Sequence, residues 1–134
     1  MSPLHLSNDA LTQIAATTSV AVPEYDRSAV TPGIIHFGVG GFHRAHQALY
    51  LDKLMRQGKA LDFGIVGMGV MPSDARMRDS LHSQDCLYTL TEKSPDGSEN
   101  ARVVGSIIDY VFAPDDPAHA VEVLASPEIK IVSL

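Results

Sequence analysis

The sequence predicts an α/β domain with a mostly parallel sheet, into which one antiparallel hairpin is inserted. Short apolar runs at residues 34–37, 63–68 and 129–134 have the composition of buried strands, and amphipathic helical patterns separate them. The first two runs and the helical segment between them form a strand–helix–strand unit, which predicts a right-handed parallel crossover. Two alternating runs around a turn, within residues 85–111, predict the hairpin.

Composition limits the chain to one domain and excludes some partners. A chain of 134 residues, 45% of them hydrophobic, can build one core. A net charge of −6 argues against nucleic acid as a partner, because phosphate binding needs clustered basic residues. Cys86 is the only cysteine, so no internal disulfide can form, and we expect a cytoplasmic protein. The first residues lack the pattern of a signal peptide and no apolar run is long enough to cross a membrane, so we expect no membrane partner.

Residues 1–33 are predicted to form a short helix and an extended lead-in. Ser7 has the residue type and position of a helix N-cap, and Leu11, Ile14 and Ala15 follow on one helical face. Residues 23–33 contain prolines and end in Pro-Gly, which is typical of irregular structure. The first core strand then begins at residue 34.

A helix is predicted over residues 42–56, after the first strand. Ala45, Leu49 and Leu54 lie at helical spacing with polar residues between them, and Gly58 is expected to end the helix. The second strand, residues 63–68, follows it.

The hairpin has two predicted strands, residues 85–92 and 102–111. The first alternates in polarity, and residues 94–98 form a strong turn signal between the two. A helix over residues 74–82 is expected to precede the hairpin.

A helix over residues 117–124 and a buried strand over residues 129–134 complete the predicted order. Pro117 suits the first helical turn, and Asp115 and Asp116 lie near the positive end of the helix dipole. Because the sequence stops inside the last strand, we expect a fragment of a longer protein.

The glycine turn (residues 38–43) is the most informative motif. It reads G-x-G-x-x-H, follows an apolar strand and begins a helix, which is the setting of a dinucleotide-binding turn. In that interpretation Gly38 makes the turn, Gly40 admits the pyrophosphate, and backbone N–H groups of residues 41–43 point toward it. Arg44 and His43 are expected to add positive charge beside the turn. A turn that merely allows tight packing of strand and helix is the alternative.

Asp74 is the candidate acid for the ribose of a dinucleotide. Such a site has an acidic residue after the second strand, and the candidates after residue 68 are Asp74 and, further on, Asp79, of which we favour Asp74. It could also cap the helix over residues 75–82, and the two roles are compatible.

Metal and catalytic sites are not predicted in this chain. His36, His43 and His46 lie close in sequence, but no carboxylate or cysteine at a supporting spacing completes a ligand set. No Ser-His-Asp set or pair of carboxylates is evident, so we expect no catalytic residue here.

Beyond the glycine motif, residues 23–28 and 32–48 resemble the N-terminal domain of the long-chain mannitol dehydrogenase family. The run Gly-Phe-His-Arg-Ala-His-Gln at residues 41–47 carries most of the resemblance, and the family places histidine where the third glycine of the fingerprint usually stands. The likeness continues in shorter segments as far as the last strand, at residues 77–79, 84–85, 87–90, 104–106 and 125–134.

The resemblance implies a Rossmann-like, dinucleotide-binding domain over residues 34–134. It also implies a helical C-terminal domain, absent from this chain, that holds the polyol and supplies a catalytic lysine. Family members transfer a hydride between a sugar alcohol or aldonate and a nicotinamide cofactor. Mannitol and fructose are the expected pair; a fructuronate or tagaturonate reductase, or a nucleotide-binding module without catalysis, is the alternative.

The resemblance also implies the residues that contact the cofactor. They are Phe37, Gly38, Val39, Gly40, Gly41, Phe42, His43, Arg44 and Asp74. Some family members have Glu before this acid, where this chain has Ser73. We therefore expect NAD rather than NADP, with a weaker preference than two carboxylates would give.

Overall fold

The computed structural model describes residues 2–134, and Met1, the first residue of the predicted N-terminal segment, lies outside the described residues. The strands are β1 (Pro32–Phe37), β2 (Gly64–Gly69), β3 (Tyr88–Lys93), β4 (Glu99–Val104), β5 (Ile107–Phe112) and β6 (Ile131–Ser133). The α-helices are α1 (Leu11–Thr17), α2 (Gly41–Ala45), α3 (Gln47–Met55), α4 (Ala75–His82) and α5 (Pro117–Leu124). Short 3₁₀ helices are η1 (Asn8–Ala10), η2 (Arg27–Ala29) and η3 (Pro72–Asp74).

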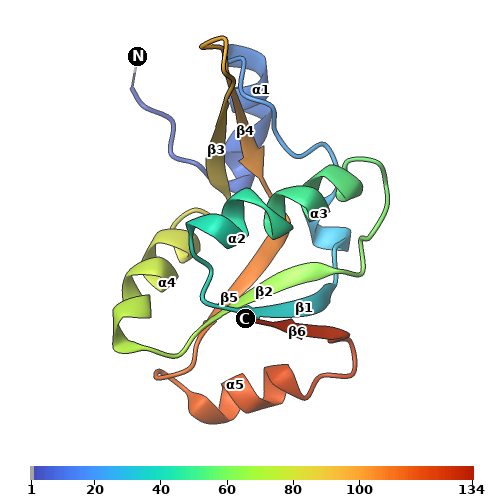
Figure 1. The fold of residues 1–134 in the computed structure, drawn as a ribbon, viewed down its shortest axis with the longest axis vertical. Coiled ribbons are helices and arrows are strands. Elements are labelled where there is room, and N and C mark those ends of the chain that lie inside the picture. Colours follow the sequence, from blue (N-terminus) through green and yellow to red (C-terminus); the bar gives the residue numbers. More distant parts are fainter. Residues whose placement is uncertain (1) are drawn as a thin grey trace.

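The main sheet is parallel, with the strand order β5-β2-β1-β6. Helices cover both of its faces: α2, α3 and α4 lie on one side and α5 on the other (Figure 1). Two apolar clusters result, one around Ile34 and Ile65 and one around Ile35 and Val66. Neighbouring residues of one strand serve opposite clusters, as the pleat of a strand requires. The predicted fold class, an α/β Rossmann-like domain, is confirmed.

Strands β3 and β4 form the predicted antiparallel hairpin, which stands apart from the main sheet (Figure 1). The prediction of one returning strand over residues 102–111 is wrong, because the chain divides there into β4 and β5 at Gly105 and Ser106. Gly105 donates its N–H to the Asp52 carboxylate at 3.0 Å, and the Ser106 hydroxyl donates to the carbonyl oxygen of Ala48. These bonds to α3 replace ladder bonds, so the chain leaves the hairpin and enters the parallel sheet.

The single helix predicted over residues 42–56 is also wrong, since it breaks at His46 into α2 and α3. The backbone of His46 has φ −125° and ψ −85°, outside the helical region. The break changes which side chains face the sheet. Ala48 and Met55 are fully buried, whereas Leu54, which the unbroken pattern put on the core face, is 38% exposed.

The N-terminal segment is held to the body of the domain by polar contacts. Ser7 occupies the N-cap position of η1, but its side chain makes no capping bond. Asn8 instead donates its N–H to the Asp85 carboxylate at 2.8 Å. Ile14 is the buried residue of α1, and Ala15, which was predicted to share its inward face, is exposed.

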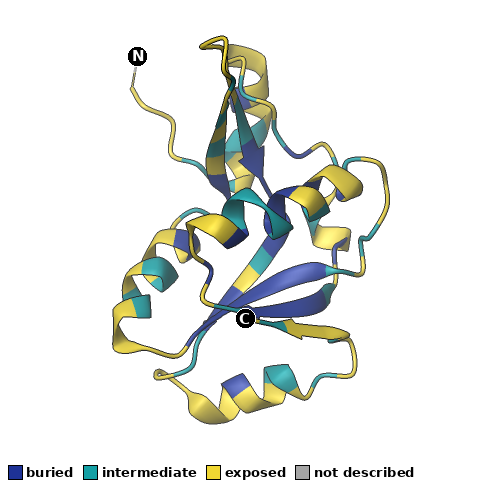
Figure 2. Cartoon of the chain, viewed as in Figure 1, coloured by how far each residue is buried: buried dark blue, intermediate teal, exposed yellow. Residues whose placement is uncertain are grey.

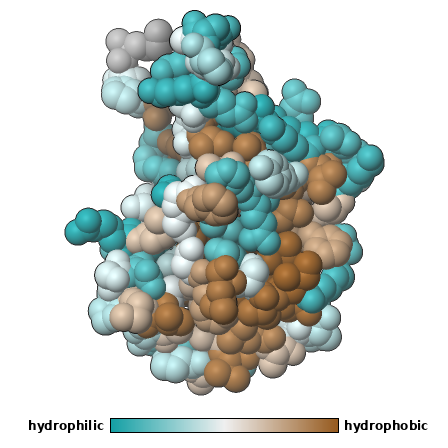
Figure 3. Space-filling model, in the orientation of Figure 1, coloured by the Kyte–Doolittle hydropathy of each residue, from teal (hydrophilic) through white to brown (hydrophobic). Residues whose placement is uncertain are grey.

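Strand β6 was predicted to be buried, and this prediction is wrong. Within residues 2–134 it is an edge strand paired with β1, and Ile131 and Val132 are 44% and 54% exposed. Figure 2 shows the contrast with β1 and β2, which are buried along most of their length. Apolar residues gather on the surface near β6 and α5 (Figure 3). A parallel strand is buried only where neighbours cover its faces and both edges.

Two further observations complete the fold. Asp116, which was expected only near the positive end of the helix dipole, also caps α5 by accepting the N–H of His119 at 3.0 Å. Within residues 2–134, no helix combines the length and apolar character needed to span a membrane.

Candidate functional site

The glycine turn lies at the carboxyl end of β1, where the order of the sheet changes direction. From β1 the sheet continues through β2 to β5 on one side, while β6 lies on the other. In open parallel sheets, ligands bind outside the carboxyl ends of the strands at such a switch point. The motif and the topology therefore identify the same position.

Backbone hydrogen bonds and one buried side chain hold the turn in place. Gly38 has φ +76°, a conformation that glycine adopts readily, and its N–H donates to the carbonyl oxygen of Met68 at 3.1 Å. Gly40 donates to the carbonyl oxygen of Gly38 at 2.7 Å. Val39 is buried against β2, where a Cβ on Gly67 would lie 2.5 Å from Val39 Cγ2. The absence of a side chain at Gly67 thus makes room for the turn.

Gly40 itself is not required by the packing of the protein. Its φ of −78° is available to any residue, and an added Cβ would meet only the carbonyl oxygen of Gly38, at 3.9 Å. A Cβ on Gly41 would meet nothing within 4 Å. Both glycines leave open space in front of the turn, so the backbone is accessible to a ligand there.

The first turn of α2 offers donors to that space. Gly40 is the N-cap and has no side chain with which to bond the first N–H groups of the helix. Arg44 lies beside the turn: its Nε donates to the carbonyl oxygen of Gly40 at 3.3 Å, and its guanidinium lies 5.8 Å from the centre of the Tyr88 ring. Backbone donors and one positive charge suit an anionic group.

A pair of stacked imidazoles, His36 and His43, lies behind the turn. Their ring centres are 3.7 Å apart and the planes differ by 9°. His36 Nδ1 lies 2.7 Å from the Ser133 hydroxyl on β6. Among the described residues, neither ring nitrogen of His43 makes a well-aligned hydrogen bond, and the nearby Gln47 side chain is the polar group that acts on its ring. Burial lowers the pKa of His43 to about 4, and the adjacent His36 is the second cause. We call this pair the histidine stack.

Asp74 lies beside the carboxyl end of β2, the strand next to β1. Its Oδ2 accepts the N–H groups of Val70 and Met71 at 3.0 and 2.9 Å. Gly69 leaves room for it, since a Cβ there would lie 2.6 Å from Asp74 Cβ. The carboxylate makes no capping bond to α4, so the predicted helix-cap role is wrong. It orders the loop between β2 and α4 instead.

The predicted site residues do not all present their side chains to this edge. Val39 is buried, and Phe37 packs with the apolar cluster on the α5 side of the sheet, so both could reach a ligand there only through their backbones. Phe42 is 79% exposed. Gly38, Gly40 and Gly41 form the open part of the turn.

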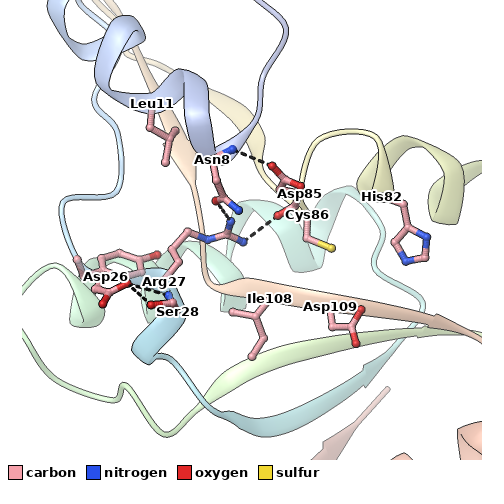
Figure 4. Close-up of a pocket in the computed structure, with 11 residues that line it drawn as sticks. Asn8, Leu11, Asp26, Arg27, Ser28, His82, Asp85, Cys86, Ile108 and Asp109 are labelled. Atoms are coloured by element: carbon pink, nitrogen blue, oxygen red, sulfur yellow. Dashed lines mark hydrogen bonds between the residues drawn. The ribbon is translucent and has the colours of Figure 1, made fainter.

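A separate cavity lies between α1, η2 and β5, with a volume of about 620 Å³ (Figure 4). Arg27 lies in this cavity and donates to the Asn8 side chain and to three carbonyl oxygens, of Asp85, Gly105 and Ile107. Burial raises the pKa of the Cys86 thiol to about 12, which disfavours a thiolate nucleophile. This cavity is therefore built for structure.

Sequence reasoning missed Arg27 and Asp52 as structural residues. Asp52 is fully buried and accepts hydrogen bonds from Tyr25 Oη and Arg56 Nε at 2.6 and 2.7 Å. The only sequence signal is the i, i+4 spacing of Asp52 and Arg56. Among residues 2–134, no three His, Cys, Asp or Glu side chains lie close enough together to hold a metal ion.

The family model of the mannitol dehydrogenase Rossmann domain matches residues 32–134. The chain belongs to the mannitol dehydrogenase family. Among the relatives, a mannitol 2-dehydrogenase of Aspergillus oryzae is 53% identical over the whole of this chain and 27% of its own length. The chain thus spans about a quarter of the length of the curated relatives it matches.

Two solved structures of related enzymes share the fold. One is a mannitol 2-dehydrogenase of Pseudomonas fluorescens in ternary complex with NAD and D-mannitol: its TM-score is 0.92 at 45% identity, over 98% of this chain and 26% of that one. The other is a D-sorbitol dehydrogenase in substrate-free form, with a TM-score of 0.85 at 37% identity, over 96% of this chain and 26% of that one. Both confirm the Rossmann-like fold expected from the glycine motif.

Proposed function

We propose that this chain is the dinucleotide-binding part of an NAD-dependent polyol dehydrogenase of the mannitol 2-dehydrogenase type. The observation that carries the proposal is the open space at Gly40, where the protein's own packing does not require a glycine. A dinucleotide explains it, because the pyrophosphate must approach the backbone at this point of the fingerprint. The relative from Pseudomonas fluorescens, whose complex holds NAD and D-mannitol, supports the choice of ligands.

In this proposal the pyrophosphate lies against Gly38, Gly40 and Gly41. The N–H groups at the start of α2, in Phe42 and His43, face its negative charge, and Arg44 adds a positive charge beside the turn. Phe37 and Val39 contribute backbone, because their side chains pack inside the domain.

Asp74 receives the ribose of the adenosine in this proposal. Its Oδ2 is engaged by two backbone N–H groups, which fixes the carboxylate at the end of β2. A carboxylate accepts hydrogen bonds from ribose hydroxyls and repels a 2′-phosphate, so we propose NAD as the cofactor rather than NADP.

The nicotinamide, when bound, accepts a hydride from the secondary alcohol of the polyol or returns it to the ketone. The residues of this chain bind and orient the cofactor. We propose that residues 1–33 form the lead-in, that residues 34–134 form the cofactor domain, and that a helical C-terminal domain supplies the polyol site and the catalytic groups. Mannitol and fructose are the proposed substrate pair, in the cytoplasm.

Titration of NADH into the full-length protein, followed by nicotinamide fluorescence, tests the proposal. We expect Gly40→Val to abolish the signal with little change in the free energy of unfolding, because the added side chain projects into open space. Gly58→Ala is the matched control. Gly58 also has open space around it but has φ +72°, so this substitution should lower stability by about 1 kcal/mol and leave NADH binding intact. Failure of the unsubstituted protein to bind NADH would refute the proposal.

A further inference from the structure

The structure assigns a positioning role to the histidine stack: His36 and His43 together hold the glycine turn in the shape that receives a dinucleotide. This inference rests on the proposed function. In the usual fingerprint, a third glycine lets the helix approach the strand closely. Here His43 stands at that position, and its ring packs on the ring of His36. A flat aromatic contact replaces direct contact between the helix and strand.

The histidine stack joins the two ends of the glycine turn. His36 belongs to β1, which leads into the turn, and His43 belongs to α2, which leads out of it. The residues between them, 37–42, include the three glycines that leave space for a ligand. Since the two rings are in contact at 3.7 Å, the entry and exit of the turn cannot separate without breaking the stack.

Ser133 on β6 connects a third element to the histidine stack. It lies opposite His36 in the parallel pairing of β1 with β6, and its hydroxyl is 2.7 Å from His36 Nδ1. Ser133, His36 and His43 thus connect β6, β1 and α2 behind the position proposed for the pyrophosphate. The hydrogen bond fixes the orientation of the His36 ring, which in turn sets the plane against which His43 packs.

The cost of burying His43 indicates a specific role for its ring. Both ring nitrogens of His43 are buried, and the only polar side chain that acts on the ring as a hydrogen-bond partner is the neighbouring Gln47, so most of its polar surface is poorly compensated. A small apolar residue would avoid this cost but would provide no planar surface for His36. The low pKa of His43 is consistent with a neutral ring that can remain packed there.

The break at His46 fits the same arrangement. The two rings occupy the space between β1 and the first turn of α2, whereas Ala48 in α3 is fully buried. Between these two contacts, the φ and ψ angles of His46 leave the helical region.

Binding of NADH to alanine and phenylalanine variants of the full-length protein tests the inference. We expect His36→Ala and His43→Ala each to raise the Kd for NADH by about ten-fold, and the double variant to lie close to the weaker single one, because both remove the same contact. His43→Phe keeps a flat ring and should restore the Kd to within about three-fold of the original. His119→Ala, on exposed α5, is the matched histidine control and should leave the Kd unchanged.

The outcomes separate this inference from the proposed function. If the unsubstituted protein binds NADH and both alanine variants bind within two-fold of it while remaining folded, the positioning role is wrong and the proposed function stands. If the alanine variants do not fold, His43→Phe decides: a folded His43→Phe that binds NADH supports the stack, and one that has lost binding overturns it. If the unsubstituted protein binds no NADH, both the proposed function and the positioning role of the histidine stack are wrong.

Discussion

The carboxylate of Asp52 on α3 accepts a hydrogen bond from the backbone N–H of Gly105, where the chain leaves the hairpin for the parallel sheet. The same fully buried carboxylate accepts bonds from Tyr25 and Arg56. Arg56 also donates to the carbonyl oxygens of Val22 and Val103. Burial and the adjacent Asp52 raise the pKa of Tyr25, so its hydroxyl keeps its proton and remains a donor. Asp52 thus connects the lead-in and α3 to the segment between β4 and β5.

Replacing Asp52 should therefore destabilise the whole domain. We expect Asp52→Ala to lower the free energy of unfolding by about 3–5 kcal/mol, because it leaves a partly buried Arg56 and a buried N–H without their partner. Urea denaturation measures this loss. Asp79→Ala, which removes an exposed carboxylate, is the control and should change stability by less than about 0.5 kcal/mol. Equal effects of the two substitutions would contradict the role of Asp52.

Arg27 should not tolerate replacement by lysine. Its guanidinium donates to the Asn8 side chain and to the carbonyl oxygens of Asp85, Gly105 and Ile107, in several directions at once. An ammonium group lacks this planar set of donors, so Arg27→Lys should cost about 2–4 kcal/mol despite keeping the charge. Differential scanning calorimetry would register a lower Tm. An unchanged Tm would show that the charge alone is sufficient.

Acid should destabilise the domain partly through His43. Its folded pKa is about 4, below the ordinary value of 6.5, so the unfolded state binds more protons between these pH values. The contribution of His43 to stability is therefore complete above pH 6.5 and is lost as the pH falls toward 4, to a total of about 3 kcal/mol.

This contribution can be isolated by comparing the protein with His43→Phe. The free energy of unfolding is measured in urea from pH 7.5 to pH 4, and its slope against pH should be smaller for the variant. Carboxylates titrate in both proteins and cancel in the comparison. Identical slopes would mean that the pKa of His43 is the same in the folded and unfolded states.

Asp74 should control the choice between the two nicotinamide cofactors. Asp74→Ala removes the carboxylate that we propose faces the ribose, so the affinity for NADH should fall while that for NADPH falls less or rises. We expect the ratio of the two affinities to change by about ten-fold or more, the effect of one charged contact. Parallel fluorescence titrations with both cofactors measure it. Equal losses for NADH and NADPH would mean that Asp74 only orders the loop through Val70 and Met71.

The strands, the crossover and the glycine turn could be predicted because their signals are local. Apolar runs at residues 34–37 and 63–68 and the glycines between them are adjacent in sequence, and each element agrees with its neighbour. The division at Gly105 and Ser106 could not be predicted in this way. The run from residue 102 to residue 111 is continuous in composition, and contacts with α3, distant in sequence, interrupt it.

The break at His46 and the histidine stack have the same explanation. Helical spacing predicts one helix through residues 42–56, because no proline or glycine marks residue 46. His36 and His43 meet only after the strand and helix have packed, and single-sequence patterns do not report which rings will stack. Asp52 was missed because periodicity treats a carboxylate as a surface residue, whereas here its bonding partners come from three separate segments.

Gly105 and Ser106, the two residues between β4 and β5, determine where residues can be inserted into the hairpin. Both residues are bonded to α3, and one added residue there would turn the side chains of β5, such as Tyr110, to the opposite face of the sheet. The other end of the hairpin, around Asp96 and Gly97, is exposed and projects away from the sheet (Figure 1). We therefore expect the tip of the hairpin to tolerate insertions and fused segments without a change in the fold of the parallel sheet.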